Sequence, residues 1–357
     1  MKPTWAVVAT LDEPAALVAA FVAHHLAQGA AKVHLFLDQP DAEAQAMLAD
    51  LPGCEVTVCD ASYWAASAHG KRPALHTSRQ VKNARQVYAR CGADWLLHCD
   101  GDEFLRDGVM LRAELARAPA KAMYMRLLVA ERAYPRGAVG AQIFSGVFRH
   151  ELPDYPHHGP EVYGEMQAYF HYGLTGHRAG KALVRVGAGM QMGLHAPLGK
   201  PAHKAIQSTR LLHFDGLTRL HFTLKLLRRA HEPPSHASNR HGAARSTQFL
   251  SMCEAMAAPE MRTALVAVLK ELEPDQIRQL RRLGALDETG FDPRPVLAAA
   301  GLAPDLSEAA FDASLRQRYA GFLQKHAPDL ARVSSNRTTA SSPRHPSSAQ
   351  TRSSSGR

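Results

Sequence analysis

The sequence predicts an α/β protein with a doubly wound, Rossmann-like parallel sheet in its N-terminal half and a helical C-terminal region. Three observations support this prediction. Apolar runs without alternation recur in the first hundred residues, segments of helical period separate them, and the chain from about Leu217 onward shows mainly helical patterns. Strands that alternate with helices at this spacing are typical of βαβ units, whose parallel sheet is covered on both faces.

The elements of the N-terminal half follow in order. Residues 4–10 (TWAVVAT) are β-branched and apolar without alternation, which predicts a strand buried on both faces. An Ala/Leu-rich helix follows over residues 15–29 and ends at its closing glycine. The runs VHLFLD and CEVTVCD predict the next two strands, with a short helix between them that ends near Leu51. A helix over residues 78–91 and a fourth strand within ADWLLHCDGDEFL complete this half.

The second half is expected to contain strands, then a loop-rich region, then helices. The runs AMYMRLLVA and QIFSGVFRH predict strands, and LVRVGAGMQMGLHAP is interpreted as a strand pair. Residues 151–180, rich in Gly, Pro, His and Tyr, are expected to form loops that bind a substrate. The segments with helical period are LTRLHFTLKLLRRA, TQFLSMCEAM, MRTALVAVLKEL, PDQIRQLRRLGAL and EAAFDASLRQRYAGFLQKH.

Composition limits the classes of function. The 357 residues are 46% hydrophobic and 21% charged, as in a folded globular protein. The net charge of +9 suggests a nucleic-acid partner, but five arginines and no acidic residue lie in residues 332–357, which leaves +4 for the rest. This Ser/Arg-rich tail has too few apolar residues to fold, so we expect residues 331–357 to be disordered. We predict no nucleic-acid partner.

Cysteine content and hydropathy favour a cytoplasmic protein. The five cysteines form no CxxC pair, and their odd number argues against a complete disulfide framework. Asp12 and Glu13 interrupt the first apolar run, which makes it a poor signal peptide, and no stretch reaches the length of a transmembrane segment. The basic amphipathic segment LTRLHFTLKLLRRAH has two interpretations. It is a solvated face over the core, or a peripheral contact with the inner membrane face and an anionic acceptor.

The sharpest chemical feature is the run Asp100-Gly101-Asp102-Glu103, directly after the apolar segment WLLHC. Ligands of open α/β sheets bind outside the carboxyl ends of the strands, which is where this run is expected. Carboxylates one residue apart are hard ligands suited to Mg²⁺ or Mn²⁺ that also hold phosphates. We therefore expect a metal and diphosphate site here. The alternative is an acidic turn that caps the next segment, a role also open to Glu103.

The run DWLLHCDGDEFL resembles the signature of bacterial GT-A glycosyltransferases of the family 2-like group related to family 92. Other segments agree in order, namely ATLDEP with AFVAHHLAQGAAKVHLFLDQPDA, then GKALVR, then LLHFDGLTRLHFTLKLLRR. The resemblance implies a GT-A (nucleotide-diphospho-sugar transferase) domain over residues 1–229, followed by a helical region over 230–330 and the tail over 331–357. It implies a hexosyltransferase that uses a nucleotide-sugar, and by analogy a role in surface polysaccharide biosynthesis.

The resemblance also implies a metal site. Asp100 and Asp102 would hold Mn²⁺ or Mg²⁺ and, through the ion, the diphosphate of a UDP-sugar or GDP-sugar. A third ligand in such enzymes is often a distant histidine, and the candidates are His195 and His213.

Other donor contacts are implied for charged residues near the strand ends. The acidic residues that would lie near the nucleobase or ribose are Asp12, Glu13 and Asp38. The basic residues that would neutralise the leaving phosphate are Lys181, Arg185 and Lys225. Two departures from the family pattern affect the ribose and acceptor sides. The segment Gln39-Pro40-Asp41 replaces an Asn-x-Ser/Asp cluster, and MYMRLLVAERAYPRG lacks the expected tryptophan.

Sugar transfer also needs a group on the acceptor side. Negative charge builds on the leaving diphosphate, where a divalent ion stabilises it. An inverting reaction needs a carboxylate that takes the proton of the acceptor hydroxyl. Glu161 and Glu165 are the favoured candidates and Asp154 is a third, because they lie in the aromatic stretch PDYPHHGPEVYGE. The expected acceptor is a glycan or a lipid-linked sugar.

Two other classes of function are alternatives. A phosphohydrolase of the DxD type would use the first Asp as nucleophile. Such a motif usually has Thr or Val soon after the second Asp and lies early in the chain. Here Glu103 and Phe104 follow the second Asp, and the motif begins at position 100. A nucleic-acid-binding protein would need basic residues interleaved with aromatic ones on a folded surface. A zinc site at His157 and His158 is not expected, because no matching Cys/His spacing accompanies them.

Overall fold

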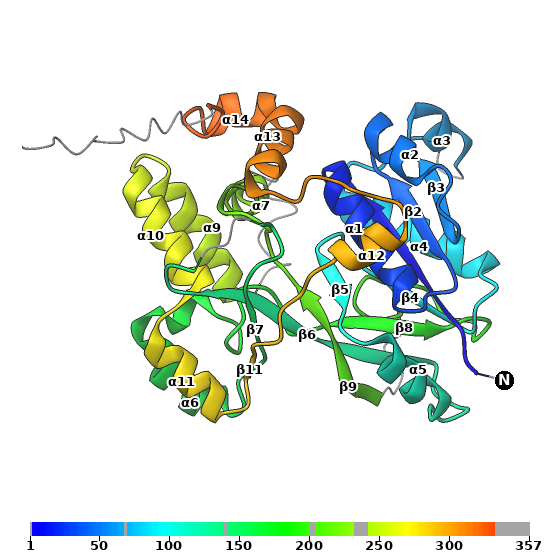
Figure 1. Cartoon of the computed structure of the whole chain (residues 1–357), viewed down its shortest axis with the longest axis horizontal. Coiled ribbons are helices and arrows are strands. Elements are labelled where there is room, and N and C mark those ends of the chain that lie inside the picture. Colours follow the sequence, from blue (N-terminus) through cyan, green and yellow to red (C-terminus); the bar gives the residue numbers. More distant parts are fainter. Residues whose placement is uncertain (1, 68–69, 139–141, 200–203, 232–241, 333–357) are drawn as a thin grey trace, which may run out of the picture.

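The computed structural model describes residues 2–67, 70–138, 142–199, 204–231 and 242–332. Its centre is a mixed β-sheet in the order β11-β7-β6-β8-β4-β1-β2-β3, to which β5, β9 and β10 are joined outside this path. Helices α1 and α12 lie beside the N-terminal strands, and helices α9 and α10 lie beyond the far end of β6 (Figure 1). The predicted α/β class is confirmed.

The N-terminal half is the predicted parallel unit. Its strands are β1 (Trp5–Leu11), β2 (Val33–Leu37), β3 (Cys54–Val58) and β4 (Trp95–His98). β1 pairs in parallel with β2 and β4, and β2 pairs in parallel with β3. The connecting helices are α1 (Ala15–Ala27), α2 (Ala42–Leu48), α3 (Ala61–Ala66) and α4 (His76–Arg90). Of these, α3 was not predicted.

β1 is buried on both faces, as its unbroken apolar run predicts. Val7 and Ala9 belong to the larger apolar cluster, which includes Phe21 of α1. Val8, between them, points to the other face and belongs to a second cluster with Val87 of α4. Each face of the sheet therefore has its own apolar layer, and this removes the need for polar alternation.

The later strands make the sheet mixed. They are β5 (Glu103–Leu105), β6 (Tyr124–Pro135), β7 (Val147–Arg149), β8 (Lys181–Arg185) and β9 (Lys204–His213). β8 is antiparallel to both β4 and β6, and β9 pairs with β5 and β6. The expected strand pair over residues 183–197 is wrong, because only β8 forms. Gly187 and Gly189, both at positive φ, turn the chain after it.

The segment expected to be loops is partly helical. Within residues 151–180, α6 (Tyr155–Tyr163) and the 3₁₀ helix η1 (Gly164–Tyr169) form. Pro156 in the first turn suits the start of α6, because no intrahelical donor is lost there. Val162 and Tyr163 are buried and anchor this segment. The prediction of a loop-rich region is therefore wrong for this stretch.

The C-terminal region is helical but also completes the sheet. Its helices are α7 (Arg219–Ala230), α9 (Ala243–Ala255), α10 (Pro259–Lys270), α11 (Pro274–Arg282), α12 (Arg294–Ala299), α13 (Glu308–Arg318) and α14 (Ala320–His326). The single helical pattern over residues 308–326 breaks at Tyr319 into two helices. Short strands β10 (Glu271–Leu272) and β11 (Leu286–Asp287) pair with β6 and β7. The predicted tail over 331–357 lies almost entirely outside the described residues.

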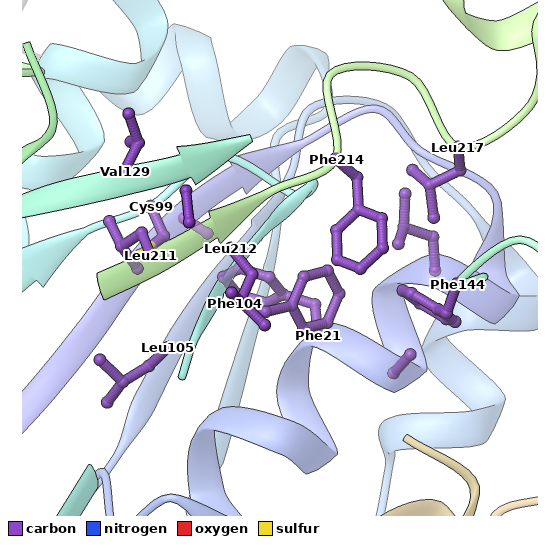
Figure 2. Close-up of a cluster of buried hydrophobic side chains, with 14 of the residues drawn as sticks. Phe21, Cys99, Phe104, Leu105, Val129, Phe144, Leu211, Leu212, Phe214 and Leu217 are labelled. Carbon is purple, nitrogen blue, oxygen red and sulfur yellow. The ribbon is translucent and has the colours of Figure 1, made fainter. Parts of the chain in front are cut away.

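An aromatic cluster fixes β5 against β9. Phe104 is fully buried, and its ring centroid lies 5.3–5.5 Å from those of Phe144 and Phe214. Figure 2 shows Phe104 among these rings, Phe21 of α1 and Leu212 of β9. Phe104 faces Leu212 in the antiparallel register. This packing holds the end of β9 beside the turn that precedes β5. No helix in the described ranges combines the length and hydropathy of a membrane span.

Candidate active site

The acidic run forms the tight turn between β4 and β5. The Glu103 carboxylate accepts a hydrogen bond of 2.9 Å from the backbone N–H of Asp100, which closes the turn. Gly101 packs so closely that a Cβ there would lie 3.1 Å from side-chain atoms of Leu11 and Glu13. The turn therefore sits directly against the end of β1, at the carboxyl ends of the parallel strands.

The two aspartates of this turn each bind a different lysine. Asp100 accepts hydrogen bonds of 2.6 Å from Lys181 Nζ and from Gln80 Nε2. Asp102 accepts one of 2.5 Å from Lys225 Nζ. Burial favours the neutral form of Asp102, but Lys225 and His213 outweigh burial and lower its pKa to about 2. Lys181 likewise holds the pKa of Asp100 well below its usual range, despite burial. Both carboxylates are ionised at neutral pH.

Asp102 belongs to a buried cluster with His213 and Asp215. One ligand atom from each of these three residues lies within 4.8 Å of the others. The cluster forms because β9 ends beside the acidic turn. His213 lies opposite Glu103 in the antiparallel register, and the Phe214 N–H donates to the Asp102 carbonyl at 2.9 Å. This pairing joins residues that are more than a hundred positions apart in the chain.

Asp215 was not among the predicted site residues. It is buried, it adopts a left-handed φ of 41°, and its carboxylate accepts hydrogen bonds from Arg245 and from Thr175 Oγ1. Its sequence signal was the Asp-Gly pair in LLHFDG, which marks the end of a strand in the same way as the run at position 100. The strain of a non-glycine residue at positive φ is typical of functional positions.

The cluster has the donor set of a divalent-cation site. Two carboxylates and an imidazole suit Mn²⁺ or Mg²⁺. His213 Nε2 lies 3.7 Å from Asp102 Oδ2, so this ring nitrogen faces the carboxylate. The residues present are therefore compatible with a bound metal ion.

His177 and His195 form a pair of neutral histidines. His195 lies beside His177, with ring centroids 4.2 Å apart, and its Nδ1 is 3.0 Å from the Gly180 carbonyl. Burial lowers the pKa of His195 to about 4 and that of His177 to about 2. His195 therefore lies beside Gly180 and His177 and is not part of the three-residue cluster.

Several buried polar atoms near this turn lack hydrogen bonds within the described part of the chain. They include both ring nitrogens of His98, Nδ1 of His177 and Oε2 of Glu13. His98 is fully buried on β4, directly before the acidic turn. Buried polar groups are normally satisfied, so a group of unsatisfied ones indicates a place that water or a ligand completes.

Asp38 lies in an ion network at the end of β2. Its carboxylate accepts two hydrogen bonds of 2.6 Å from Arg79 and one of 2.9 Å from Arg72. Burial would raise the pKa of Asp38, but hydrogen bonds from His76 and Arg79 lower it. Asp38 also lines an open cleft of about 460 Å³ at the ends of β2 and β3, together with Trp64.

Asp12 and Glu13 diverge at the end of β1. Asp12 accepts a hydrogen bond of 2.9 Å from Arg318, so it is linked to α13. Glu13 lies against the acidic turn, since a Cβ on Gly101 would be 3.1 Å from its Cγ, and its Oε2 is 3.5 Å from Nε2 of His221 on α7. Burial and the nearby Asp102 raise the pKa of Glu13 to about 8.

Arg185, Glu161 and Glu165 lie away from the acidic turn. Arg185 pairs with Trp95 at the amino end of β4 and donates to the Ala122 carbonyl. Glu161 and Glu165 are exposed on α6 and η1, and Glu161 accepts a hydrogen bond from His158 at 2.9 Å. Figure 1 shows α6 beside α11, away from β4.

No protein-family model and no curated protein matches the sequence. Among solved structures, the mannosyltransferase PcManGT from Pyrobaculum calidifontis, in complex with GDP-Man and Mn²⁺, is 12% identical, with a TM-score of 0.38 over 93% of this chain and 86% of that chain. S. aureus TarS 1-349 is 8% identical, with a TM-score of 0.31 over 92% and 89%.

A CMP:2-keto-3-deoxy-manno-octonic acid synthetase complexed with CTP is 15% identical, with a TM-score of 0.24. This match covers 36% of the present chain and only 53% of the synthetase, about half of its length.

Proposed function

We propose that this chain is a metal-dependent GT-A glycosyltransferase, related to the family 2-like enzymes that its sequence resembles. It transfers a hexose from a UDP-sugar or GDP-sugar to a glycan or lipid-linked acceptor. The observation that supports this function is the buried Asp102, His213 and Asp215 cluster, which lies at the carboxyl end of β4 in an open α/β sheet.

The residues of the cluster have separate tasks in this proposal. Asp102, His213 and Asp215 hold Mn²⁺ or Mg²⁺, which supplies positive charge that stabilises the leaving diphosphate. Asp100 shares this edge and fixes the Lys181 ammonium, which is a second positive charge beside the phosphates. Lys225, on α7, donates a hydrogen bond to the Asp102 carboxylate. Cations on two sides suit a leaving group that gains negative charge.

The nucleoside of the donor is proposed to bind in the cleft at the ends of β2 and β3. The cleft has a volume of about 460 Å³, which falls in the range of small-ligand sites. Asp38, Cys59 and Trp64 line it, and Arg72 stands at its edge with a half-exposed side chain. Asp12 and Glu13, at the neighbouring end of β1, remain proposed donor contacts.

The general base, a further metal ligand and a further donor contact stay predictions. Glu161 and Glu165 stay predictions for the general base, since neither lies near the Asp102 cluster. His195 stays a predicted metal ligand, although it contacts Gly180 and His177. Arg185 stays a predicted donor contact, and it is held at the opposite end of β4.

A donor-hydrolysis screen tests the proposed function. The chain is incubated with UDP-sugars and GDP-sugars and Mn²⁺, and the released nucleoside diphosphate is measured. We expect release from at least one donor that stops when Mn²⁺ is chelated and that Asp102→Asn abolishes. Asp50→Asn, an exposed position on the turn after α2, is the matched control and should keep the wild-type rate. Release that Asp102→Asn leaves unchanged would refute the proposal.

A further inference from the structure

The Lys225 ammonium lies between the two carboxylates of the proposed metal site. Its Nζ is 2.5 Å from Asp102 Oδ2 and 3.4 Å from Asp215 Oδ1. Asp102 and Asp215 both belong to the three-residue cluster, in which one ligand atom from each residue lies within 4.8 Å of the others. A protein cation therefore stands in the place where a cation shared by Asp102 and Asp215 would bind.

The two lysines of the site are held differently. The Lys181 side chain is 1% exposed and lies between Asp100, at 2.6 Å, and Glu103, at 3.3 Å. The Lys225 side chain is 27% exposed, whereas its partners Asp102 and Asp215 are 7% and 1% exposed. Lys225 thus reaches the carboxylates from the solvent side on a flexible stem. It can leave without unpacking the core, and Lys181 cannot.

Electrostatics makes Lys225 and a divalent ion compete. Both need the same Asp102 and Asp215 oxygens, and at this separation two cations repel strongly in a buried site. Lys225 must therefore move when a divalent ion binds. Its ammonium then needs another anion, because a charge near a buried site is costly without a partner. The diphosphate of the donor would bring that anion to the same edge of the sheet.

We propose that Lys225 is an exchange residue: it neutralises Asp102 and Asp215 in the empty site and moves to the donor diphosphate when the divalent ion binds. This inference rests on the proposed function and deepens it. Lys225 is a positioning residue in the empty site and a donor-binding residue in the loaded one. As a consequence, the ion alone binds weakly, and the ion and nucleoside diphosphate bind together.

The test is the affinity for Mn²⁺ alone, measured by electron paramagnetic resonance of the free ion. Lys225→Met keeps the apolar stem and removes the charge. We expect it to bind Mn²⁺ about tenfold more tightly than the wild type in the absence of nucleotide, equivalent to about 1.4 kcal/mol. Lys225→Arg keeps the charge and should bind Mn²⁺ no more tightly than the wild type. Lys32→Met, at an exposed ion pair with Glu55, is the control and should change nothing.

A second arm adds saturating UDP or GDP. The wild type should then gain Mn²⁺ affinity, and the gain should be smaller in Lys225→Met because the diphosphate has lost one cation. Thermal unfolding verifies that each variant is folded. Suppose that the wild type binds Mn²⁺ with nucleotide but that, without nucleotide, Lys225→Met binds Mn²⁺ no more tightly than the wild type. The exchange is then refuted and the proposed function stands.

Two other results are informative. If neither protein binds Mn²⁺ under any condition, the metal-dependent function itself fails. If the wild type binds UDP or GDP but gains no Mn²⁺ affinity with the nucleotide, while Lys225→Met binds Mn²⁺, Lys225 replaces the ion permanently. That result overturns the exchange.

Discussion

At the scale of single residues, buried charges are tied to particular partners, and those partners set what each residue can do. Asp38 was predicted as a ribose contact, yet it is 1% exposed and its oxygens are bound by Arg79 and Arg72. Asp102, in the same edge region, is bound by one flexible lysine. The first arrangement is fixed, and the second can be exchanged for a ligand.

Asp38→Asn should therefore be costly for stability. It leaves the buried Arg79 guanidinium without its charge partner, and breaking a buried pair costs about 3–5 kcal/mol. The lowered pKa of Asp38 means that the pair stabilises the fold above the unfolded pKa and that this contribution is lost as acid protonates Asp38. Urea unfolding at pH 7 measures the cost. A loss below about 1 kcal/mol would mean that the network is not a stabilising one.

Asp215→Asn tests a ligand that was not predicted from the sequence. The substitution keeps the shape of the side chain and removes one of the two carboxylates that Lys225 and the proposed ion share. We expect Mn²⁺-dependent binding of UDP or GDP to weaken at least about tenfold, as for a lost charge-assisted contact. Isothermal titration calorimetry gives the affinity. Equal affinity in variant and wild type would remove Asp215 from the site.

At the scale of elements, β5 and β9 determine where the site forms. β5 is only three residues long, and Phe104 at its centre packs among Phe144, Phe214 and Phe291 with ring centroids 5.0–5.5 Å away. The backbone pairing with β9 then places His213 opposite Glu103. The aromatic cluster is thus the structural support of the acidic turn.

Phe104→Leu tests this support. It shortens the buried side chain and leaves a cavity beneath the turn, and we expect a loss of about 1–3 kcal/mol in the free energy of unfolding. The affinity for Mn²⁺ with nucleotide should fall as well, because His213 and Asp215 lose their fixed position. Leu250→Ala, at a side chain 67% exposed on α9, is the control and should change stability little. Unchanged stability in Phe104→Leu would contradict the cluster's role.

At the scale of the whole molecule, many histidines are held in their neutral form at buried or half-buried positions. Burial lowers their pKa values to between about 2 and about 4 at these positions: His24, His25, His98, His150, His177, His195 and His221. Below pH 6.5 the unfolded chain binds protons at these positions and the folded chain does not. Acid therefore favours the unfolded state.

The chain should lose stability steeply as the pH falls from about 6.5 toward 4. Each such histidine contributes a slope of about 1.4 kcal/mol per pH unit in this window. The sign follows from linkage, because stability rises with pH where the unfolded state binds more protons. Thermal midpoints at pH 7.5, 6.0 and 5.0 measure the effect. A midpoint that stays constant from pH 7.5 to 5.0 would contradict the buried neutral histidines.

Local patterns were sufficient for the N-terminal half of the fold except α3, and for the acidic turn. The unbroken apolar run of β1 predicts burial on two faces, and Asp100 with Asp102 follows an equally clear strand. β9 was missed because KAIQSTRLLH mixes polar and apolar residues without a strand period. The contacts of Lys225 and Asp215 with Asp102 depend on that strand and on a separation of more than a hundred residues. No local pattern encodes them.

The most direct measurement of the central claim is the thermal midpoint of the wild type and Asp102→Asn with Mn²⁺, with UDP or GDP, and with both. Ligands that bind the folded state raise the midpoint. We predict that Mn²⁺ and nucleoside diphosphate together raise the wild-type midpoint more than either alone, and that Asp102→Asn loses this increase while remaining folded. An equal increase in Asp102→Asn, or the same increase with inorganic phosphate or an oligonucleotide, would contradict a metal and nucleotide-sugar site at this turn.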